Sequence, residues 1–413
     1  MDNSSIVPQI NETQTLIPNL PNDVSALILS YIPFPFHDRL KSTCKSWRKF
    51  YSSKIPLSIR LSSLPFSSLS NLLCIFPQDP SLSSPFLFDP THLAWVALPH
   101  MPINPHVYSL SNFASLAIGS SLYVLGGSLF DTRSFPMDRP TASSAVFRYD
   151  LGSRKWAQLS PMITPRGSLA VAAVGSGRIV VAGGGSRHTM FSAAGSRVGS
   201  VECYDIERDE WAPLVDLPGF RAGCAGFWVG QRREFWVMGG YGESRTINGV
   251  LPVDEYYKDA VVLELNNGGE EGNWREIGDM WDDEERTRLG KIVVIENDHD
   301  DEVEKSVFML DGDDILRYNM VSNRWFKEST VPRKTQDGSP FGFVALEGEL
   351  HVISLLQGVE LSTVRRSRHR RRGTALFMQI YDPKKMSWRS LVTRTPFQCP
   401  LDFRTAVMCT VRV

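Results

Sequence analysis

One motif recurs six times along the chain, and it constrains the fold more than any other feature. Each copy consists of an aromatic or apolar pair, a turn and a tryptophan, and the copies end at Trp95, Trp156, Trp211, Trp274, Trp325 and Trp388. A period of roughly 50 to 60 residues is typical of a blade array, whereas a solenoid of helices repeats over shorter lengths. The repeat therefore predicts an all-β propeller that serves as a binding platform rather than as a catalyst.

Each repeat unit predicts four short strands. In the unit that contains Trp211, segments rich in apolar and β-branched residues cover 168–174, 178–182, 201–205 and 211–214, with turn residues between them. Glycine pairs follow the second strand at 126–127, 183–184 and 239–240. A double glycine suits positive φ and close backbone approach near a crowded axis.

The strand count also predicts how the ring closes. Five complete units begin near Phe113, Ser168, Ala222, Leu289 and Phe341. Three further strands precede them within 72–98, and one more follows at 405–411. We therefore predict a six-bladed propeller over 72–413, whose last strand closes the blade begun at 72–98 and leaves no lone edge strand.

The first fifty residues show a helical pattern instead. Val24, Leu27, Ile28 and Tyr31 have the spacing of one helix face, which ends at Pro33. A second helix is predicted from about Asp38, with Leu40, Thr43, Cys44, Trp47 and Tyr51 along one side. Two such helices cannot bury all this apolar surface alone, so they imply a partner. We expect a disordered tail over 1–15, a helical module over 16–53 and a connection over 54–71.

The repeat units resemble the kelch motif, in which a diglycine is followed by Tyr-Asp and then by Trp about six residues later. The resemblance covers about Leu72 to Val413. The fourth and fifth units lack the glycine pair, and the copy that ends at Trp274 lacks Tyr-Asp. An unrelated all-β array is the alternative.

The helical module resembles an F-box. The resemblance rests on Leu20-Pro21-Asn22-Asp23, on Ile28 to Pro33 and on Cys44-Lys45-Ser46-Trp47-Arg48. Phe34-Pro35-Phe36-His37 departs from the leucine and acidic residues that the family often carries there, which leaves the turn between the helices open. The resemblance implies docking on a Skp-family adaptor, and through it on a cullin, by an apolar contact of Leu20, Pro21, Ile28, Ile32, Leu40, Cys44 and Trp47. A plain helical cap on the propeller is the alternative.

Four arginines stand just before a first strand or the closing strand: Arg166, Arg221, Arg288 and Arg404. Because successive strands of a blade are antiparallel, these positions share one face with the long loops 128–144, 185–199, 241–258 and 356–373. Kelch substrate receptors are similar in using arginines at this position to hold acidic peptides. We predict that the four arginines ring the central opening and contact a target with an acidic or phosphorylated patch. The alternative is that they only satisfy loop carbonyls.

Two charge runs accompany this pattern. Arg365–Arg372 falls in the last long loop, and Glu296–Glu304 joins a first strand to a second and so lies on the opposite face. The basic run is compatible with a target contact, a nuclear signal or a disordered loop, and both runs with solvated insertions. Without interleaved aromatics, the basic run does not predict nucleic-acid binding.

Several function classes are not expected. The net charge is −1, no 18-residue apolar run occurs, and the N-terminus lacks a basic region followed by an apolar core. None of the six cysteines forms CxxC or clusters with histidines at metal-ligand spacing, so no metal or cofactor is predicted. We expect a non-catalytic, cytoplasmic or nuclear protein that resembles the plant F-box/kelch receptors of SCF (Skp–cullin–F-box) ubiquitin ligases. A kelch scaffold without a ubiquitin role is the alternative.

Overall fold

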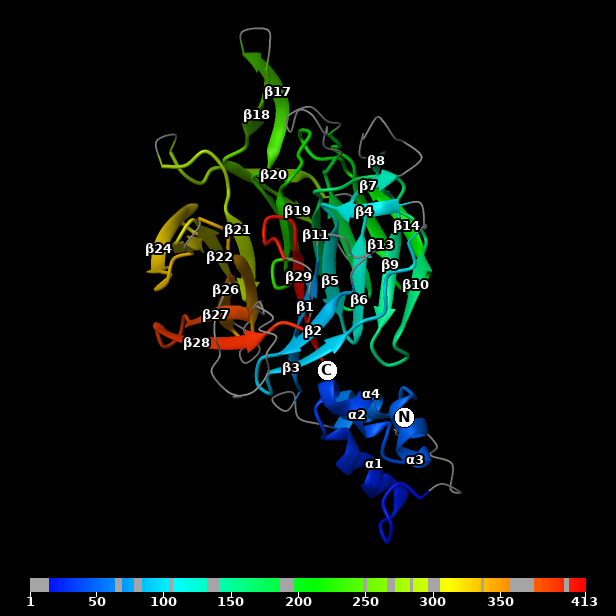
Figure 1. Cartoon of the computed structure of the whole chain (residues 1–413). Coiled ribbons are helices and arrows are strands. Elements are labelled where there is room, and N and C mark those ends of the chain that lie inside the picture. The colour runs from blue at the N-terminus through cyan, green and yellow to red at the C-terminus, as the bar shows by residue number, and fades with distance from the viewer. Residues whose placement is uncertain are drawn as a thin grey trace.

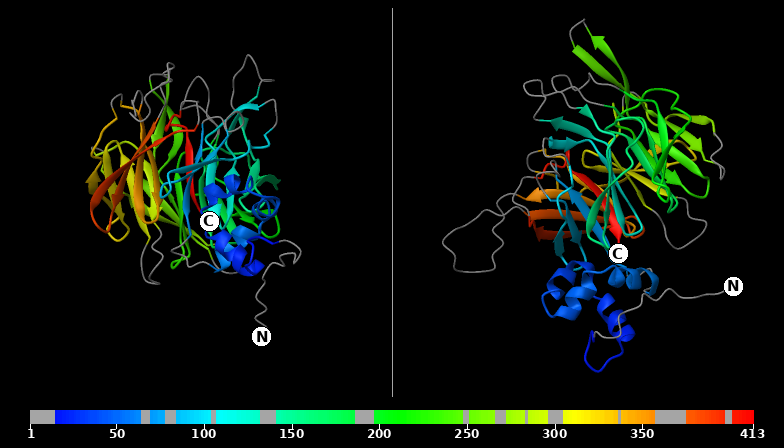
Figure 2. Two further views of the ribbon diagram at one scale, coloured as in Figure 1. Left: turned by 60° about the horizontal axis from the view of Figure 1, so that its bottom comes forward. Right: turned by 90° about the vertical axis from the view of Figure 1, so that its right-hand side faces the viewer.

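Six four-stranded antiparallel sheets surround a common axis in the computed structural model, and a small helical module lies at one end of them (Figures 1 and 2). The structure describes residues 15–63, 69–77, 84–103, 107–131, 141–185, 197–247, 251–265, 272–282, 285–295, 305–335, 338–356, 375–396 and 401–413. The all-β propeller and the small helical module at its N-terminal side agree with the fold predicted from the sequence.

The first sheet is built from both ends of the chain. Its order is β29 (Val407–Arg412), β1 (Asn71–Phe76), β2 (Phe86–Asp89) and β3 (Ala94–Ala97). The β1–β29 ladder is in continuous register from Asn71 opposite Arg412 to Phe76 opposite Val407. Ser70 and Val413 extend it with two backbone hydrogen bonds of 2.7 and 2.9 Å. The last strand is therefore the innermost strand of this blade.

The other five sheets follow one another along the chain, and in each the strands run in order from the inner to the outer edge. The second and third sheets contain β5 (Ala114–Ile118), β6 (Ser121–Leu125), β9 (Val146–Asp150) and β10 (Lys155–Leu159), and then β11 (Ala170–Val174), β12 (Arg178–Ala182), β13 (Val201–Asp205) and β14 (Glu210–Leu214). The fourth contains β15 (Ala225–Val229), β16 (Glu234–Met238), β19 (Asp259–Glu264) and β20 (Trp274–Asp279). The fifth and sixth contain β21 (Lys291–Ile295), β22 (Ser306–Asp311), β23 (Asp314–Asn319) and β24 (Arg324–Thr330), and then β25 (Gly342–Leu346), β26 (Glu349–Leu356), β27 (Ala375–Asp382) and β28 (Ser387–Arg394).

Two smaller sheets lie at the end of the propeller opposite the helical module. One contains β4 (Val107–Ser111), β7 (Ser128–Asp131) and β8 (Thr141–Ala142), and the other is the hairpin of β17 (Tyr241–Ile247) and β18 (Leu251–Tyr256) (Figure 1). The sequence pattern predicts loops over 128–144 and 241–258, so these strands are additions to the expected fold. Local pattern does not reveal them because they pair outside the repeated four-strand unit.

Five of the six recurrent tryptophans donate a hydrogen bond to the preceding blade, whereas the buried indole Nε1 of Trp325 has no hydrogen-bond partner among the described residues. The indole Nε1 of Trp211 donates to Ser160 O at 2.9 Å, and that of Trp274 donates to Val215 O at 3.0 Å, in each case at the end of the preceding blade. Trp156, Trp388 and Trp95 make corresponding bonds to Pro99 O, Ser329 Oγ and Thr393 Oγ1. In these five blades a large apolar side chain with one polar atom thus packs between blades, and that atom is hydrogen-bonded.

The glycine pairs have the conformation that the sequence predicts. Gly183 and Gly184 both have positive φ, and a Cβ on Gly183 would lie 2.3 Å from Arg221 O. Gly184 N donates to that same carbonyl at 2.6 Å, and Gly127 N donates to Arg166 O at 2.9 Å. The first two pairs therefore bring one blade's backbone against the arginine that precedes the next blade, at a distance that no larger residue allows, whereas Gly239 lies against Leu289.

The helical module contains α1 (Asn22–Ser30), the 3-10 turn η1 (Phe34–Phe36), α2 (His37–Leu40), α3 (Lys45–Tyr51) and α4 (Ile55–Ser63). The sequence predicts one helix from Asp38 onward, but the chain is extended at Cys44, so two short helices form instead. The Cys44 side chain caps α3, because its Sγ accepts a hydrogen bond from Trp47 N at 3.4 Å. Part of the predicted connection 54–71 is also helical, since it contains α4.

Candidate functional sites

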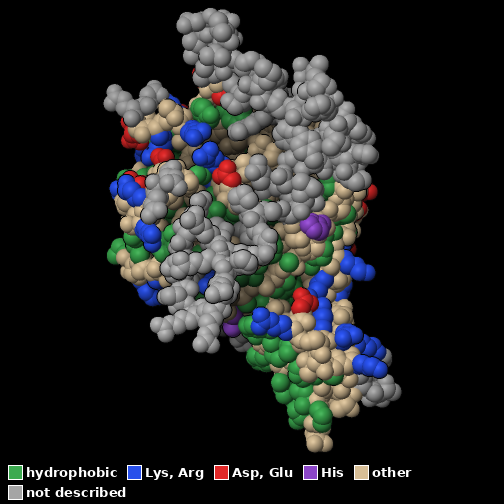
Figure 3. Space-filling view, viewed as in Figure 1, with side chains coloured by type: hydrophobic (Ala, Val, Ile, Leu, Met, Phe, Trp, Pro, Cys, Tyr) green, Lys and Arg blue, Asp and Glu red, His purple; other side chains and the backbone are tan. Residues whose placement is uncertain are grey.

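An exposed apolar face on α1 is the first candidate site. Leu20, Val24, Leu27, Ile28 and Tyr31 are between 37% and 52% exposed, and we call them the α1 apolar face. Figure 3 shows hydrophobic side chains gathered on this part of the helical module. The five residues lie on α1 or directly beside its ends, where their spacing places them together. Such a cluster of exposed large apolar side chains marks a surface for a partner.

The opposite side of α1 holds the module together. Leu29 and Ala26 are buried against Phe50 and Tyr51, and the Tyr51 hydroxyl donates to Leu29 O at 2.9 Å. Trp47 is half-buried in the same cluster, and its indole donates to Leu16 O at 2.8 Å. The helix is therefore fixed from within while its outer face stays open.

The structure divides the predicted adaptor residues into two groups. Leu20, Pro21, Ile28 and Cys44 are exposed, whereas Ile32, Leu40 and Trp47 are half-buried against the core of the module. Their roles in docking stay predictions. Val24, Leu27 and Tyr31 are not among the predicted contacts, although the helical spacing that defines the face already includes them.

Arg60 of α4 connects this module to the propeller. Its side chain is 2% exposed, and its Nε donates to Val413 O at 3.1 Å while Nη2 donates to Ser70 Oγ at 2.9 Å. Nη1 donates to the carbonyl at the end of α1, Ser30 O, at 3.0 Å, and to the next two carbonyls, both at 3.3 Å. One buried cation thus binds the α1 C-terminus, where the helix dipole is negative, and both strands of the ring seam.

Two further contacts join the helical module to the propeller. Lys54 Nζ lies 2.9 Å from Asp150 Oδ2, and Arg154 pairs with Asp38 while its guanidinium stands 4.9 Å from the centre of the Phe34 ring. His37, nearby, is buried and its Nε2 lies 2.9 Å from Ile32 O. Burial lowers the pKa of His37 to about 4, so the ring is neutral at pH 7.

Arg166 is the first of the four predicted target contacts, and it is fully buried. It forms an ion pair with Glu202, and its Nη1 donates to Gly183 O at 3.0 Å and to Ser200 O at 2.6 Å. Glu202 also accepts hydrogen bonds from the backbone of Ile163 and Thr164. Every one of these partners is internal, so Arg166 acts as a brace of its own blade.

Arg221 has the same arrangement one blade further on. It is 3% exposed, and its two terminal nitrogens bind the two oxygens of Asp259 at 2.7 and 2.6 Å. Nη1 also donates to Gly239 O at 3.3 Å, and the guanidinium lies 4.1 Å from the centre of the Tyr257 ring. For these two arginines, the alternative of satisfied loop carbonyls describes the structure better than an exposed ring.

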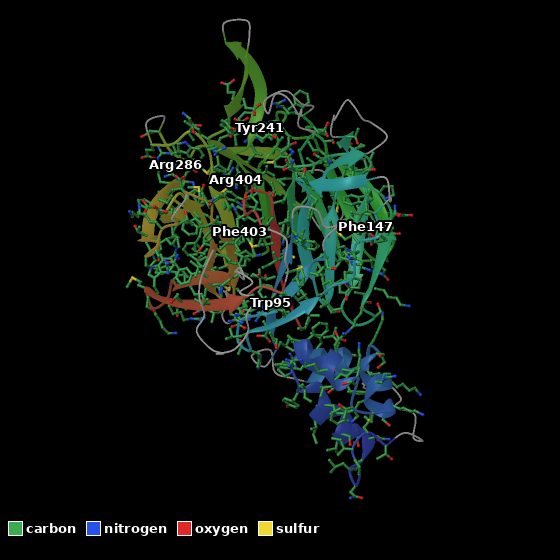
Figure 4. All side chains as sticks on the ribbon, viewed as in Figure 1. Trp95, Phe147, Tyr241, Arg286, Phe403 and Arg404 are labelled. Atoms are coloured by element: carbon green, nitrogen blue, oxygen red, sulfur yellow. The ribbon has the colours of Figure 1, made fainter. Side chains whose placement is uncertain are left out.

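Arg288 and Arg404 differ from this pair because both are exposed. Arg166 and Arg221 stand four residues before the first strand of their blades, whereas Arg288 and Arg404 stand three residues before β21 and β29. Arg286, rather than Arg288, is the less exposed arginine of this segment, and it pairs with Asp311 of its blade at 3.2 Å. Figure 4 shows Arg286 and Arg404 toward the end of the propeller that faces away from the helical module.

The two charge runs, 296–304 and 365–372, lie outside the described residues. Among the residues that are described, no group of three or more His, Cys, Asp or Glu side chains could hold a metal ion. No helix in the same ranges is long and apolar enough to cross a membrane.

A central channel of about 1060 Å³ runs between the inner strands of the six blades and is bordered by Leu61 and Leu69 on the side of the helical module.

Comparison with known proteins agrees with this architecture. The F-box domain model matches residues 17–54, and the Kelch motif model matches residues 109–163 and 166–218. The chain is 57% identical over 419 residues to the F-box/kelch-repeat protein OR23 of Arabidopsis thaliana, a match that covers 98% of this chain and 93% of the relative. It is 24% identical over 353 residues to the F-box/kelch-repeat protein At1g16250 of the same plant, with 82% of this chain and 83% of the relative covered.

A helical module with an exposed apolar face, joined to a six-bladed repeat propeller, defines a binding protein with two interaction surfaces. The chain belongs to the F-box/kelch-repeat family. In this family the F-box implies binding to a Skp-type adaptor, and the kelch repeats imply binding to a target protein.

Proposed function

We propose that this protein is the substrate-recognition subunit of an SCF-type ubiquitin ligase. The α1 apolar face docks on a Skp-family adaptor and through it on a cullin, and the propeller recruits a target protein for ubiquitination and degradation. The observation that carries the proposal is the α1 apolar face itself, five large apolar side chains that are exposed on or beside α1 while the other side of this helix packs in the core of the module.

The mechanism is proximity. The ubiquitin-charged enzyme is carried by the cullin, so this chain contributes effective concentration and orientation rather than a reacting group. The Arg60 network supports such a role because it fixes α1 to the strands of the ring seam. We place this activity in the cytoplasm, the nucleus or both.

The adaptor contact is tested by co-purification of the full chain with a Skp-family adaptor. Because burying one aspartate in an apolar interface costs several kcal/mol, Ile28→Asp should lower adaptor affinity at least 100-fold. Val321→Asp is the matched control, since Val321 is an exposed apolar residue on the propeller at 89% exposure. Failure of the wild-type chain to bind any adaptor would leave the kelch scaffold as the better interpretation.

We further propose that the target carries an acidic or phosphorylated patch and contacts the propeller end opposite the helical module. Arg288 and Arg404 are the exposed members of the predicted arginine set, and an exposed guanidinium pairs readily with carboxylate or phosphate. Arg288→Glu with Arg404→Glu should abolish target capture by a chain whose adaptor contact is disabled by Ile28→Asp, so that bound targets are not degraded. Unchanged capture by this variant would refute the arginine contact without affecting the adaptor proposal.

A further inference from the structure

Two cysteines face each other across the seam where the ring closes. Cys74 of β1 is the register partner of Cys409 of β29, and both belong to the same buried cluster. Directly opposite residues of an antiparallel pair have Cα atoms about 4.5–5.5 Å apart and side chains on the same face. Since disulfides join Cα atoms separated by about 4.4–6.8 Å, the backbone already has the spacing that a cross-strand disulfide needs.

The two thiols are in different environments. Cys74 is fully buried, whereas Cys409 is 8% exposed and lines the central channel together with Ser115. The Ser115 hydroxyl lies 3.0 Å from Cys409 Sγ and donates a hydrogen bond to it. Hydrogen bonds from the Cys74 thiol and from Ser115 lower the pKa of Cys409, while burial raises the pKa of Cys74. Cys409 is therefore the better nucleophile and the one that a small oxidant in the channel meets.

We propose that Cys409 and Cys74 form a redox modification site, at which a peroxide converts the thiol pair into a disulfide that joins the first and last strands of the propeller. The Cys409 thiolate attacks one oxygen of hydrogen peroxide, so that an S–O bond forms, the O–O bond breaks and hydroxide leaves. The Cys74 sulfur then attacks the sulfur of the resulting sulfenic acid after giving up its proton. The S–S bond forms, the S–O bond breaks, and the net products are one disulfide and two molecules of water.

The other described cysteines lack this arrangement. Cys203 stands opposite Val180 and Ala212 in its sheet, and Cys224 lies before the first strand of its blade. Cys44 is an exposed helix cap in the helical module.

The pair of Cys74 and Cys409 also lies where a covalent bond has a large effect, because the two ends of the ring meet at the β1–β29 ladder. A link there opposes opening of the propeller at its seam.

The experiment treats the purified full chain with hydrogen peroxide under native conditions. Remaining thiols are then blocked with N-ethylmaleimide in denaturant, and the protein is digested without reduction and analysed by mass spectrometry. The expected result is a reducible cross-link between the peptides of Cys74 and Cys409, with a rise of the thermal unfolding midpoint by roughly 3–8 °C. If both peptides carry N-ethylmaleimide while Cys44 is oxidised, or if Cys409 cross-links to another cysteine, the proposal is overturned.

Variants test the two roles separately. Cys74→Ser should leave Cys409 as a sulfenic acid that dimedone labels, whereas Cys409→Ser should leave Cys74 unlabelled. Cys224→Ser is the matched control, because Cys224 is also buried but outside the seam, and it should cross-link like the wild type. Dimedone labelling of Cys74 in the Cys409→Ser variant would contradict the assigned order. The wild-type cross-link needs no substitution, so it decides the proposal even if a variant does not fold.

Discussion

The Arg60→Met substitution should destabilise the junction between the helical module and the propeller. Methionine retains much of the packing volume of arginine but none of its hydrogen-bond donors. The three guanidinium nitrogens of Arg60 bind Val413 O at 3.1 Å, Ser30 O at 3.0 Å and Ser70 Oγ at 2.9 Å, and the side chain is 2% exposed. Removing it leaves Ser30 O and Ser70 Oγ without this donor, while Val413 O keeps only its hydrogen bond from Ser70 N.

The magnitude follows from the number of these bonds and from what offsets them. A hydrogen bond to a charged group contributes about 1.5–3 kcal/mol, but the wild-type protein also bears the cost of removing the guanidinium from water. Leaving a buried acceptor without its donor costs about 1–3 kcal/mol, so the two orphaned acceptors and the lost bond to Val413 O together cost roughly 3–5 kcal/mol. We expect Arg60→Met to lower the free energy of unfolding by that amount and the thermal midpoint by roughly 3–6 °C.

The assay combines thermal unfolding with hydrogen exchange of the amides of α1 and β29. Arg39→Met is the control, because Arg39 is an exposed arginine of the same module and its loss should change the midpoint by less than about 1 °C. The loss of protection should extend to both α1 and β29, since Arg60 binds residues next to each. A midpoint for Arg60→Met that equals that of Arg39→Met would show that the buried network does not hold the two parts together.

Three other predictions concern the propeller and the module. Arg166→Met should lower the free energy of unfolding by about 3–5 kcal/mol in urea titration, because it leaves the buried Glu202 charge unpaired; a change below about 1 kcal/mol would contradict the brace. The pKa of His37 is about 4 in the folded protein and ordinary in the unfolded chain, so its contribution to stability is complete above about pH 6.5 and is lost as pH falls toward 4. Urea titrations at pH 7, 6 and 5 should show that the free energy of unfolding falls less with decreasing pH in His37→Gln than in the wild type. An equal fall in both proteins would refute this assignment. Deletion of 404–413 removes β29 and exposes the edge of β1, so the chain should aggregate in size-exclusion chromatography; a monomer with the wild-type midpoint would argue against ring closure.

The repeated parts of the fold could be predicted because each is encoded within its own unit. A tryptophan such as Trp211 follows its turn at a fixed spacing, and the structure shows that it bonds to the end of the preceding blade. The Gly183-Gly184 pair was predictable for the same reason, since positive φ is a local requirement. Each of these local signals is weak alone, but their repetition along the chain predicts the number of blades.

The connection between the two parts could not be predicted in this way. The segment that contains α4 is rich in serine, which favours a linker. Its Pro56 is compatible with the first turn of a helix but does not by itself predict a helix. What fixes α4 is Arg60, whose partners Ser30 and Val413 lie far away in the sequence. A single buried arginine has no periodic pattern, so its role depends on tertiary contacts that local spacing does not encode.

The arginines before the first strands could be predicted only in part, because their position follows the repeat but their burial depends on tertiary contacts. Arg166 pairs with Glu202, the second residue of its blade's third strand, and Arg221 pairs with Asp259, the first residue of the corresponding strand. In the closing blade the third strand is β2, which begins with two apolar residues, Phe86-Leu87, and Arg404 is exposed. In the blades of Arg166 and Arg221 the arginine is buried because the pair satisfies both charges and a diglycine carbonyl together. The blade of Arg288 also has a carboxylate at the start of its third strand, Asp314, but Asp314 pairs with Lys327 and the unit lacks the glycine pair, so Arg288 is exposed. Where no carboxylate is free to pair, burial would leave the charge uncompensated, and the arginine stays at the surface.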